Sequence, residues 1–311
     1  MGKLFIISNR LPVTLSVEGD QISATASSGG LATGLSSFYK DAGGLWFGWP
    51  GISFDDIDEK TGRKVEELLK NEHQCGAVKL TEEDLQKYYY GFSNKTIWPL
   101  SHYFTNHTVF DNDLWEAYKR VNQKFCDTVV NEIGDDDIIW VNDYQLMLLP
   151  NMLRQKLPHA SIGYFHHIPF PSFELFRLMP WRREILQGLL GADLIGFHTY
   201  DYVRHFLSSV RRILGYENIL GTVSSGYRTT KVDAFPMGID YEKFSKATKM
   251  PEVRHELDRI WQQVGDRKIV VSIDRQDYTK GIKDRLEAFH IFLHRYPEYK
   301  EKVSLIMVTV P

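Results

Sequence analysis

The 311 residues include 37 lysines and arginines against 40 aspartates and glutamates, a net charge of −3, and 43% are hydrophobic. This composition is that of a globular chain of about two domains, and it excludes a wholly disordered protein. The mildly acidic balance argues against nucleic-acid partners, whose binding depends on dense positive charge. The two cysteines, Cys75 and Cys126, exclude a disulfide framework and a multi-cysteine metal site.

The N-terminus and the length of the apolar runs predict a cytoplasmic protein. The first apolar run, residues 4–7, is too short for the core of a signal peptide. Position 6 is isoleucine where a myristoylation signal has serine or threonine. No apolar stretch approaches the roughly 20 residues of a membrane span, so we expect no membrane partner.

Taken in chain order, short apolar strands alternate with helices up to about residue 240. We predict strands at 4–8, 138–142, 161–166 and 194–198, and helices at 31–39 and 199–214. Thr199 and Gly215 suit the N-cap and the C-terminal end of the last helix. The charged residues 53–74 predict a solvated surface excursion. Alternating strands and helices indicate an α/β fold with a parallel sheet covered on both faces.

The pattern then restarts. Residues 235–240 predict a turn and residues 241–264 a polar helical connector. A strand at 268–273, a helix at 282–295 and a strand at 303–310 follow. We expect an α/β domain over residues 1–240 and the start of a second over 241–311, truncated well below the size of a stable domain.

A glycine-rich segment, residues 27–34, follows the first strand and opens the first predicted helix. Glycines there let backbone N–H groups approach an anion, and the helix N-terminus favours negative charge. The spacing is not that of the dinucleotide fingerprint, and a simple turn is the alternative.

Seven aromatic residues lie between Tyr88 and Phe104, interleaved with polar groups, and Trp46 and Trp49 precede them. Aromatic rings pack against sugar rings, and tyrosine hydroxyls bond sugar hydroxyls or phosphates. Core packing is the alternative for any single ring, but the block as a whole favours the wall of a binding site.

Asp143 and His167 each stand just past the end of a predicted buried strand. In open α/β sheets ligands bind at this edge. An N-cap role for Asp143 and a structural role for His167 are the alternatives. Neighbouring strand residues point to opposite faces, so His166 and His167 do not readily share a metal, and we expect no metal site.

Arg275 ends the predicted strand of the second domain, and Lys280 and Gly281 open the helix after a short polar turn. Two permanent cations at a strand-to-helix turn make a phosphate clamp. A pair of ordinary surface cations is the alternative.

These stretches, in this order, resemble the family of trehalose-6-phosphate synthases, retaining glycosyltransferases of the two-Rossmann-domain GT-B fold. The likeness covers nearly the whole chain. The matching segments are Ser8–Pro12, Gly29–Gly30, Trp46–Trp49, Tyr89 with Trp98–Pro99, Asp143–Tyr144, His167–Pro171, Gly196–Thr199 and Arg275–Gly281. The resemblance implies transfer of glucose from UDP-glucose to glucose 6-phosphate with retention, giving α,α-trehalose 6-phosphate, with no cofactor. A homo-oligomer of the intact protein is left open.

For the donor, the resemblance implies that Gly29 and Gly30 bind through backbone N–H groups. Arg275 and Lys280 would hold the diphosphate and stabilise the charge that develops on it, and His167 would contact the transferred glucose.

For the acceptor, the resemblance implies that Arg10 and Tyr89 lie near the phosphate, that Trp98 lines the sugar and that Asp143 binds it. With Asp143, the resemblance makes His167, Arg275 and Lys280 the candidate catalytic residues.

Two departures from the family pattern stand out. Many relatives have histidines where this chain has Asn142 and Gln145, so neither histidine is essential if the chain is active. The family's second domain continues past Pro311, so we expect the chain to be an N-terminal portion that is inactive alone. The residues offer no well-supported carboxylate nucleophile pair, which favours a front-face mechanism over double displacement.

Three other functions stay open. A pseudo-glycosyltransferase that couples an activated cyclitol to an amino-sugar phosphate has the same motifs. A non-catalytic sugar-phosphate-binding fragment fits the truncation. A nicotinamide dehydrogenase is disfavoured because its glycine fingerprint is lacking.

Overall fold

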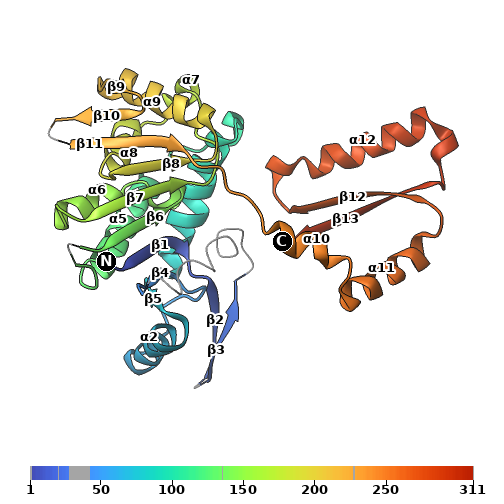
Figure 1. Ribbon diagram of the computed structural model, residues 1–311, viewed down its shortest axis with the longest axis horizontal. Helices are drawn as coiled ribbons and strands as arrows, with labels where there is room; N and C mark the ends of the chain where they lie inside the picture. Colours follow the sequence, from blue (N-terminus) through green and yellow to red (C-terminus); the bar gives the residue numbers. More distant parts are fainter. Residues whose placement is uncertain (1, 20, 28–42, 135, 227, 311) are drawn as a thin grey trace. The chain divides into compact units, whose positions relative to one another are not determined.

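The computed structural model describes residues 2–19, 21–27, 43–134, 136–226 and 228–310. It divides into two compact units, one up to Met237 and the other from Gly238 onward (Figure 1). The helix predicted at 31–39, and the predicted site residues Gly29 and Gly30, lie outside the described residues.

The first unit is built on a nine-stranded sheet with the order β5-β4-β1-β6-β7-β8-β11-β10-β9 in the described part of the chain. The seven strands from β5 to β11 pair in parallel, as predicted, and β10 and β9 add an antiparallel edge. The bounds are β1 Leu4–Arg10, β4 Trp46–Trp49, β5 Cys75–Ala77, β6 Ile138–Asn142, β7 Ser161–His166, β8 Leu194–Phe197, β9 Asn218–Ile219, β10 Thr222–Ser225 and β11 Arg228–Ala234. A separate hairpin pairs β2 (Val13–Glu18) with β3 (Gln21–Ala26).

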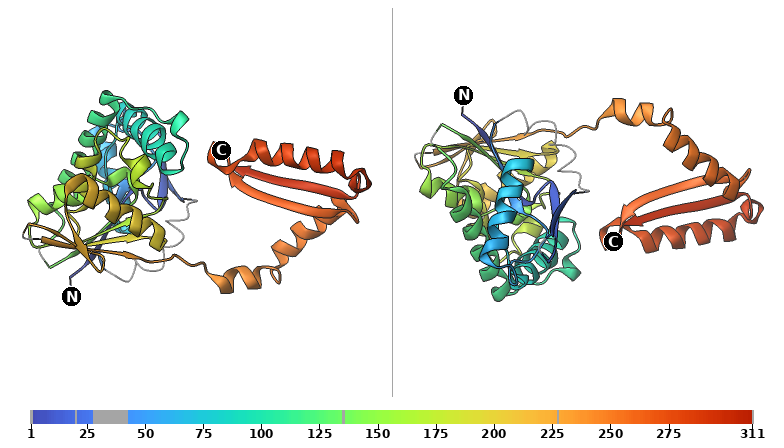
Figure 2. Two further views of the ribbon diagram at one scale, coloured as in Figure 1. Left: turned by 90° about the horizontal axis from the view of Figure 1, so that it is seen from above. Right: turned by 90° about the horizontal axis from the view of Figure 1, so that it is seen from below.

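Helices cover both faces of this sheet (Figures 1 and 2). Successive residues of a strand point to opposite faces, so Ile6 packs in one apolar cluster while Phe5 and Ile7 pack in the other. The helices are α2 Glu59–His73, α3 Glu82–Asp84, η1 Leu85–Ile97, α4 Trp98–Ser101, η2 Thr105–His107, α5 Asn112–Val129, η3 Tyr144–Leu146, α6 Leu149–Lys156, α7 Phe173–Phe176, α8 Arg182–Leu189 and α9 Tyr200–Leu214.

Helix α9 has the apolar stripe that the sequence predicts, and its two ends lie close to the predicted ones. Val203, Phe206 and Val210 are buried one turn apart, and Gly215 ends the helix with a φ of 78°. Thr199 occupies the N-cap position in extended backbone, but its hydroxyl makes no capping hydrogen bond.

The surface excursion predicted at residues 53–74 is wrong for most of its length, because Glu59–His73 forms the 15-residue helix α2. Asp58 caps it by accepting a hydrogen bond from the Thr61 N–H at 2.6 Å. Val65 and Leu69, four residues apart, are fully buried in the cluster that contains Ile6. Gly62, Val65 and Leu69 are buried on one face of this helix, although most of its other side chains are polar or charged.

The aromatic block is not a site wall as a whole, which corrects the prediction. Residues 82–101 form one continuous helical segment whose middle part, η1, has the wide π-helical turn. Tyr88 and Phe92 are fully buried and pack against Tyr118 of α5, with ring centroids 5.8 and 4.7 Å away. The aromatic residues are therefore divided between the core and the surface.

The second unit pairs β12 (Lys268–Arg275) in parallel with β13 (Val303–Val310), joined through helix α12 (Ile282–Arg295). The predicted connector is two helices, α10 (Tyr241–Ala247) and α11 (Pro251–Val264), and short 3₁₀ turns η4 (Tyr278–Lys280) and η5 (Pro297–Tyr299) complete the unit. Val271, Ile273 and Val310 are more than half exposed, so this small sheet keeps an uncovered apolar surface within the described residues.

Candidate functional site

Polar and aromatic side chains gather at the carboxyl ends of five neighbouring parallel strands. In sheet order, β4, β1, β6, β7 and β8 end at or just before Trp49, Arg10, Asp143, His167 and His198. Parallel strands bring their carboxyl ends to one edge, where open α/β sheets bind ligands. Asp143 and His167 therefore lie on one edge, as predicted, and Arg10, which only the resemblance indicated, lies on the same edge.

Arg10 lies exposed at the end of β1, held by its neighbours. Trp46 Nε1 donates to Ser8 Oγ at 2.7 Å, and Ser8 Oγ donates to the Arg10 carbonyl at 2.7 Å. The guanidinium carbon lies 4.7 Å from the Trp49 ring centroid and 5.5 Å from that of Tyr89. A guanidinium oriented by two rings presents its N–H fork in a fixed direction, which suits a phosphate.

Trp49 lies beside Arg10; it belongs to the predicted aromatic group and to the Trp46–Trp49 motif, but no individual site role was predicted for it. Its Nε1 donates to the Ile52 carbonyl at 2.6 Å, and its backbone pairs with Arg10 between β4 and β1. Gly48 allows this pairing, since a Cβ there would lie 2.8 Å from the Ser8 carbonyl oxygen. The signal in the sequence for Trp49 was its place in the Trp46–Trp49 motif.

Asp143 follows β6 in a conformation that non-glycine residues rarely adopt, with φ 76° and ψ 168°. Its N–H donates to the Phe165 carbonyl of β7 at 2.8 Å. Its Oδ1 accepts hydrogen bonds from the Tyr144 N–H at 2.9 Å and the His167 N–H at 3.2 Å. Both bonds fall on Oδ1, so, within the described residues, Oδ2 is left for a ligand.

The environment of Asp143 disfavours its charge. Burial raises the pKa of the Asp143 carboxyl to about 7, although the two backbone hydrogen bonds act to lower it. A carboxyl with a pKa near neutrality can accept a hydrogen bond or share a proton with a sugar hydroxyl. The capping bond to Tyr144 confirms the N-cap alternative for Asp143, and its role in a ligand site stays a prediction.

His167 is half-buried and is fixed by Asn142. Its Nε2 lies 3.0 Å from Asn142 Oδ1, and the amide nitrogen of Asn142 donates to the Trp140 carbonyl at 3.1 Å. Because that amide nitrogen is engaged, Oδ1 must accept, and His167 carries its proton on Nε2. Burial, with a smaller contribution from His198, lowers the pKa of His167 to about 3, so the ring is neutral and Nδ1 keeps a lone pair.

Asn142 also lies in the candidate site, through its contact with His167. The sequence indicates it only as a departure from a histidine in the family pattern. Its place directly before Asp143, at the end of a strand that pairs with β7, was the available signal.

Trp98 contacts Tyr144, the residue after Asp143. Its ring centroid lies 5.8 Å from that of Tyr144 and 4.0 Å from that of His102. The Tyr144 hydroxyl donates to Asn94 Oδ1 of η1 at 3.1 Å. These contacts join the helical segment that carries Tyr89 and Trp98 to the turn after Asp143.

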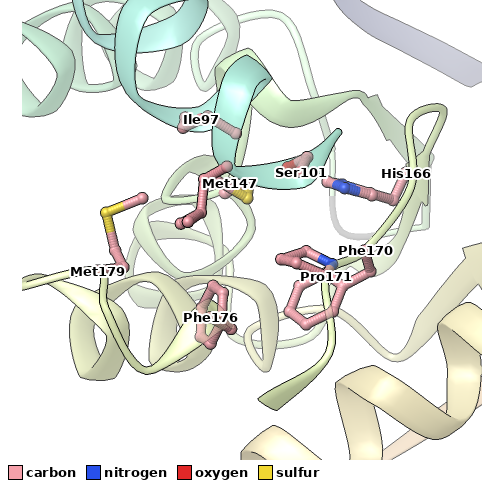
Figure 3. Close-up of a pocket in the computed structure, with 9 residues that line it drawn as sticks. Ile97, Ser101, Met147, His166, Phe170, Pro171, Phe176 and Met179 are labelled. Atoms are coloured by element: carbon pink, nitrogen blue, oxygen red, sulfur yellow. The ribbon is translucent and has the colours of Figure 1, made fainter. Parts of the chain in front are cut away.

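A cavity lies beside His166, the residue before His167 (Figure 3). Its lining is apolar except for Ser101 and His166, and it includes Phe170, Phe176 and Met179. Tyr164 Oη lies 2.9 Å from His166 Nδ1, and burial lowers the pKa of His166 to about 3. A sugar phosphate needs many polar partners, so this cavity does not suit one.

Arg275 and Lys280 belong to the second unit. Arg275 ends β12 and Lys280 ends the η4 turn, which Asp277 caps by accepting from the Thr279 N–H at 2.8 Å. Gly281, with a φ of 59°, lets the chain turn into α12. The Arg285 guanidinium bonds the Lys280 carbonyl at 3.0 Å and Asp274 Oδ2 at 2.7 Å, and so fixes this turn.

None of the described helices is both long and apolar enough to cross a membrane.

Comparison with known proteins gives one consistent result. Residues 2–311 match glycosyltransferase family 20. The UDP-forming α,α-trehalose-phosphate synthase of Pichia angusta is 45% identical over 323 residues, which cover 100% of this chain and 67% of that protein.

Two solved structures are similar as well. The UDP-forming synthase of Burkholderia xenovorans in complex with glucose-6-phosphate has a TM-score of 0.83 and 30% identity over 99% of this chain and 66% of its own. An E. coli structure bound with UDP-2-fluoro glucose has a TM-score of 0.83 and 28% identity over 99% of this chain and 64% of its own. The chain thus spans about two thirds of the length of these proteins, and over that length the predicted family and α/β GT-B fold are confirmed. The chain belongs to glycosyltransferase family 20.

Proposed function

We propose that the full-length protein transfers glucose from UDP-glucose to glucose 6-phosphate with retention and forms α,α-trehalose 6-phosphate. The observation that supports this most is the exposed Arg10 guanidinium, oriented by Trp49 and Tyr89, on the strand beside the one that ends just before Asp143. A fixed cation next to a sugar-binding carboxyl fits an acceptor with a phosphate at one end and hydroxyls at the other.

The residues divide between the two substrates. Arg10 and Tyr89 bind the acceptor phosphate, while Trp98 and Asp143 bind the acceptor sugar. His167 accepts a hydrogen bond from the transferred glucose through Nδ1. Residues 1–240 thus form the acceptor domain of this proposal.

The donor side completes the proposal. Gly29 and Gly30 bind the donor through backbone N–H groups, and Arg275 and Lys280 hold its diphosphate. Residues 241–311 begin the nucleotide-sugar domain.

In the reaction, the bond between the anomeric carbon and the β-phosphate oxygen breaks, and a bond from an acceptor hydroxyl oxygen to that carbon forms. The hydroxyl proton passes to the departing phosphate oxygen. Arg275 and Lys280 stabilise the negative charge that grows there, which is usually the largest contribution to such catalysis. Asp143 orients the attacking hydroxyl. We place this chemistry in the cytoplasm.

Incubation of the full-length protein with UDP-glucose and glucose 6-phosphate tests the proposal through UDP release and NMR of the product. We expect UDP release that depends on both substrates and an α,α-linked disaccharide phosphate. An Arg10→Ala variant is expected to need much more glucose 6-phosphate. Absence of UDP release by the wild-type protein, or a product with an inverted linkage, would refute the proposal.

A further inference from the structure

Asp143 needs an outside support, because its backbone conformation is unfavourable for a residue with a side chain. A positive φ with an extended ψ persists only where the surrounding structure enforces it. On its N-terminal side, the pairing of β6 with β7 provides that support. On its C-terminal side, the chain leaves the sheet in the short turn η3, so another element must hold it.

That element is α5. The buried hydroxyl of Tyr118 donates to the Tyr144 carbonyl at 2.7 Å and accepts from the Met147 N–H at 3.0 Å. One turn later, the buried amide of Asn122 donates to the Gln145 carbonyl at 3.0 Å. Three hydrogen bonds from one helix face therefore fix the backbone of the turn that begins at Asp143.

The Tyr118 ring is itself held rigidly. It is fully buried and lies 5.8 Å from Trp115, 4.7 Å from Phe92 and 5.8 Å from Tyr88, measured between ring centroids. Tyr88 donates its hydroxyl hydrogen to Asn9 Oδ1, next to Arg10, at 3.0 Å. The same aromatic cluster thus supports the strand end at Arg10 and the turn at Asp143.

We propose that Tyr118 is a positioning residue for acceptor binding, acting through the Tyr144 carbonyl and the Met147 N–H to aim the Asp143 carboxyl. This inference rests on the proposed function, since it assigns Asp143 to the acceptor. The buried setting that raises the pKa of Asp143 agrees with a turn held in place from behind. Because Asp143 is assigned to the acceptor, loss of the Tyr118 hydroxyl is expected to weaken acceptor binding more than donor binding.

The test compares Tyr118→Phe with Thr230→Val in the full-length protein. Thr230 is a matched control because its buried hydroxyl also reaches two backbone groups, the carbonyls of Leu190 and Ala192. Thr230 lies in β11 next to Lys231, which pairs with Leu194 at the start of β8. It is therefore near the amino ends of the parallel strands, whereas the site lies at their carboxyl ends.

We expect Tyr118→Phe to raise the KM for glucose 6-phosphate about fivefold or more while the KM for UDP-glucose stays within about twofold. Thr230→Val is expected to lower stability in urea to a similar degree and to leave both KM values near wild type. An unchanged acceptor KM in Tyr118→Phe would overturn the inference, and so would equal changes in the two variants.

Two further measurements keep the test decisive. If Tyr118→Phe fails to fold, Asn122→Ala is the second variant, because it keeps the Tyr118 hydroxyl and loses the bond to the Gln145 carbonyl. It must raise the KM for glucose 6-phosphate.

If the wild-type protein transfers no glucose, the proposed function fails. Carbon-13 NMR titration of the Asp143 carboxyl, assigned with Asp143→Asn, then decides the inference. We expect its midpoint to fall in Tyr118→Phe and not in Thr230→Val, and an unchanged midpoint would refute it.

Discussion

Replacement of Asp143 by asparagine is expected to stabilise the protein at neutral and alkaline pH. Burial raises the pKa of this carboxyl to about 7 from an ordinary 3.8. The folded state therefore favours the protonated form, and stability falls as the pH rises from about 4 to about 7. Asparagine cannot ionise, and its Oδ1 can still accept from the N–H groups of Tyr144 and His167.

The size of the effect follows from the pKa difference. About three pKa units correspond to about 4 kcal/mol of unfolding free energy. Asp143 keeps some solvent exposure, which reduces the cost of its charge, so we expect a gain of about 2 kcal/mol at pH 8 and about none at pH 4.

Urea unfolding of the 311-residue chain, followed by tryptophan fluorescence at both pH values, measures this gain. Six of the seven tryptophans lie before Met237, so the signal reports mainly on the first unit. In the full-length protein, the same variant is expected to use glucose 6-phosphate poorly and to bind UDP normally. If Asp143→Asn is no more stable than wild type at pH 8, the electrostatic reasoning fails.

Arg275→Ala in the full-length protein is expected to lower kcat by at least tenfold. The reason is that a charge-assisted contact contributes about 1.5–3 kcal/mol and the negative charge on the departing diphosphate grows during the reaction. Steady-state kinetics measures kcat, and an unchanged kcat would contradict the leaving-group role. Burial lowers the pKa of His167 to about 3 from 6.5, so its contribution to stability is complete above pH 6.5 and is lost as the pH falls toward 3. His167→Gln is expected to flatten that loss in urea unfolding, and an identical acid profile would show that the histidine titrates normally. The 311-residue chain alone is expected to release no UDP from UDP-glucose and glucose 6-phosphate, and turnover near that of the full-length protein would contradict this expectation.

Strand ends were the part of the site that the sequence predicted well. Asp143 and His167 follow apolar runs that indicate buried strands, and each run can be recognised from its own residues alone. Trp49 could not be assigned in this way, because its contact with Arg10 depends on which strands are neighbours and in which register. That information is shared between two distant segments.

Helix α2 and the Asp143 turn show two other limits. In α2, Val65 and Leu69 give too short an apolar pattern to outweigh the surrounding charges, and the sheet cluster supplies the missing reason for burial. The positive φ of Asp143 has no local signal, because hydrogen bonds from α5 and β7 impose it. Long-range contacts decide both features.

The fixed amide of Asn142 has a consequence for ligand selectivity. By committing the His167 proton to Nε2, it makes the opposite ring nitrogen a pure acceptor. A sugar that presents a hydroxyl there can donate, whereas an analogue with fluorine or a carbonyl oxygen at that carbon offers only lone pairs and is repelled. In the proposed function, discrimination between a polyol and its deoxyfluoro or keto counterpart would therefore originate in Asn142, which acts on the sugar only through His167.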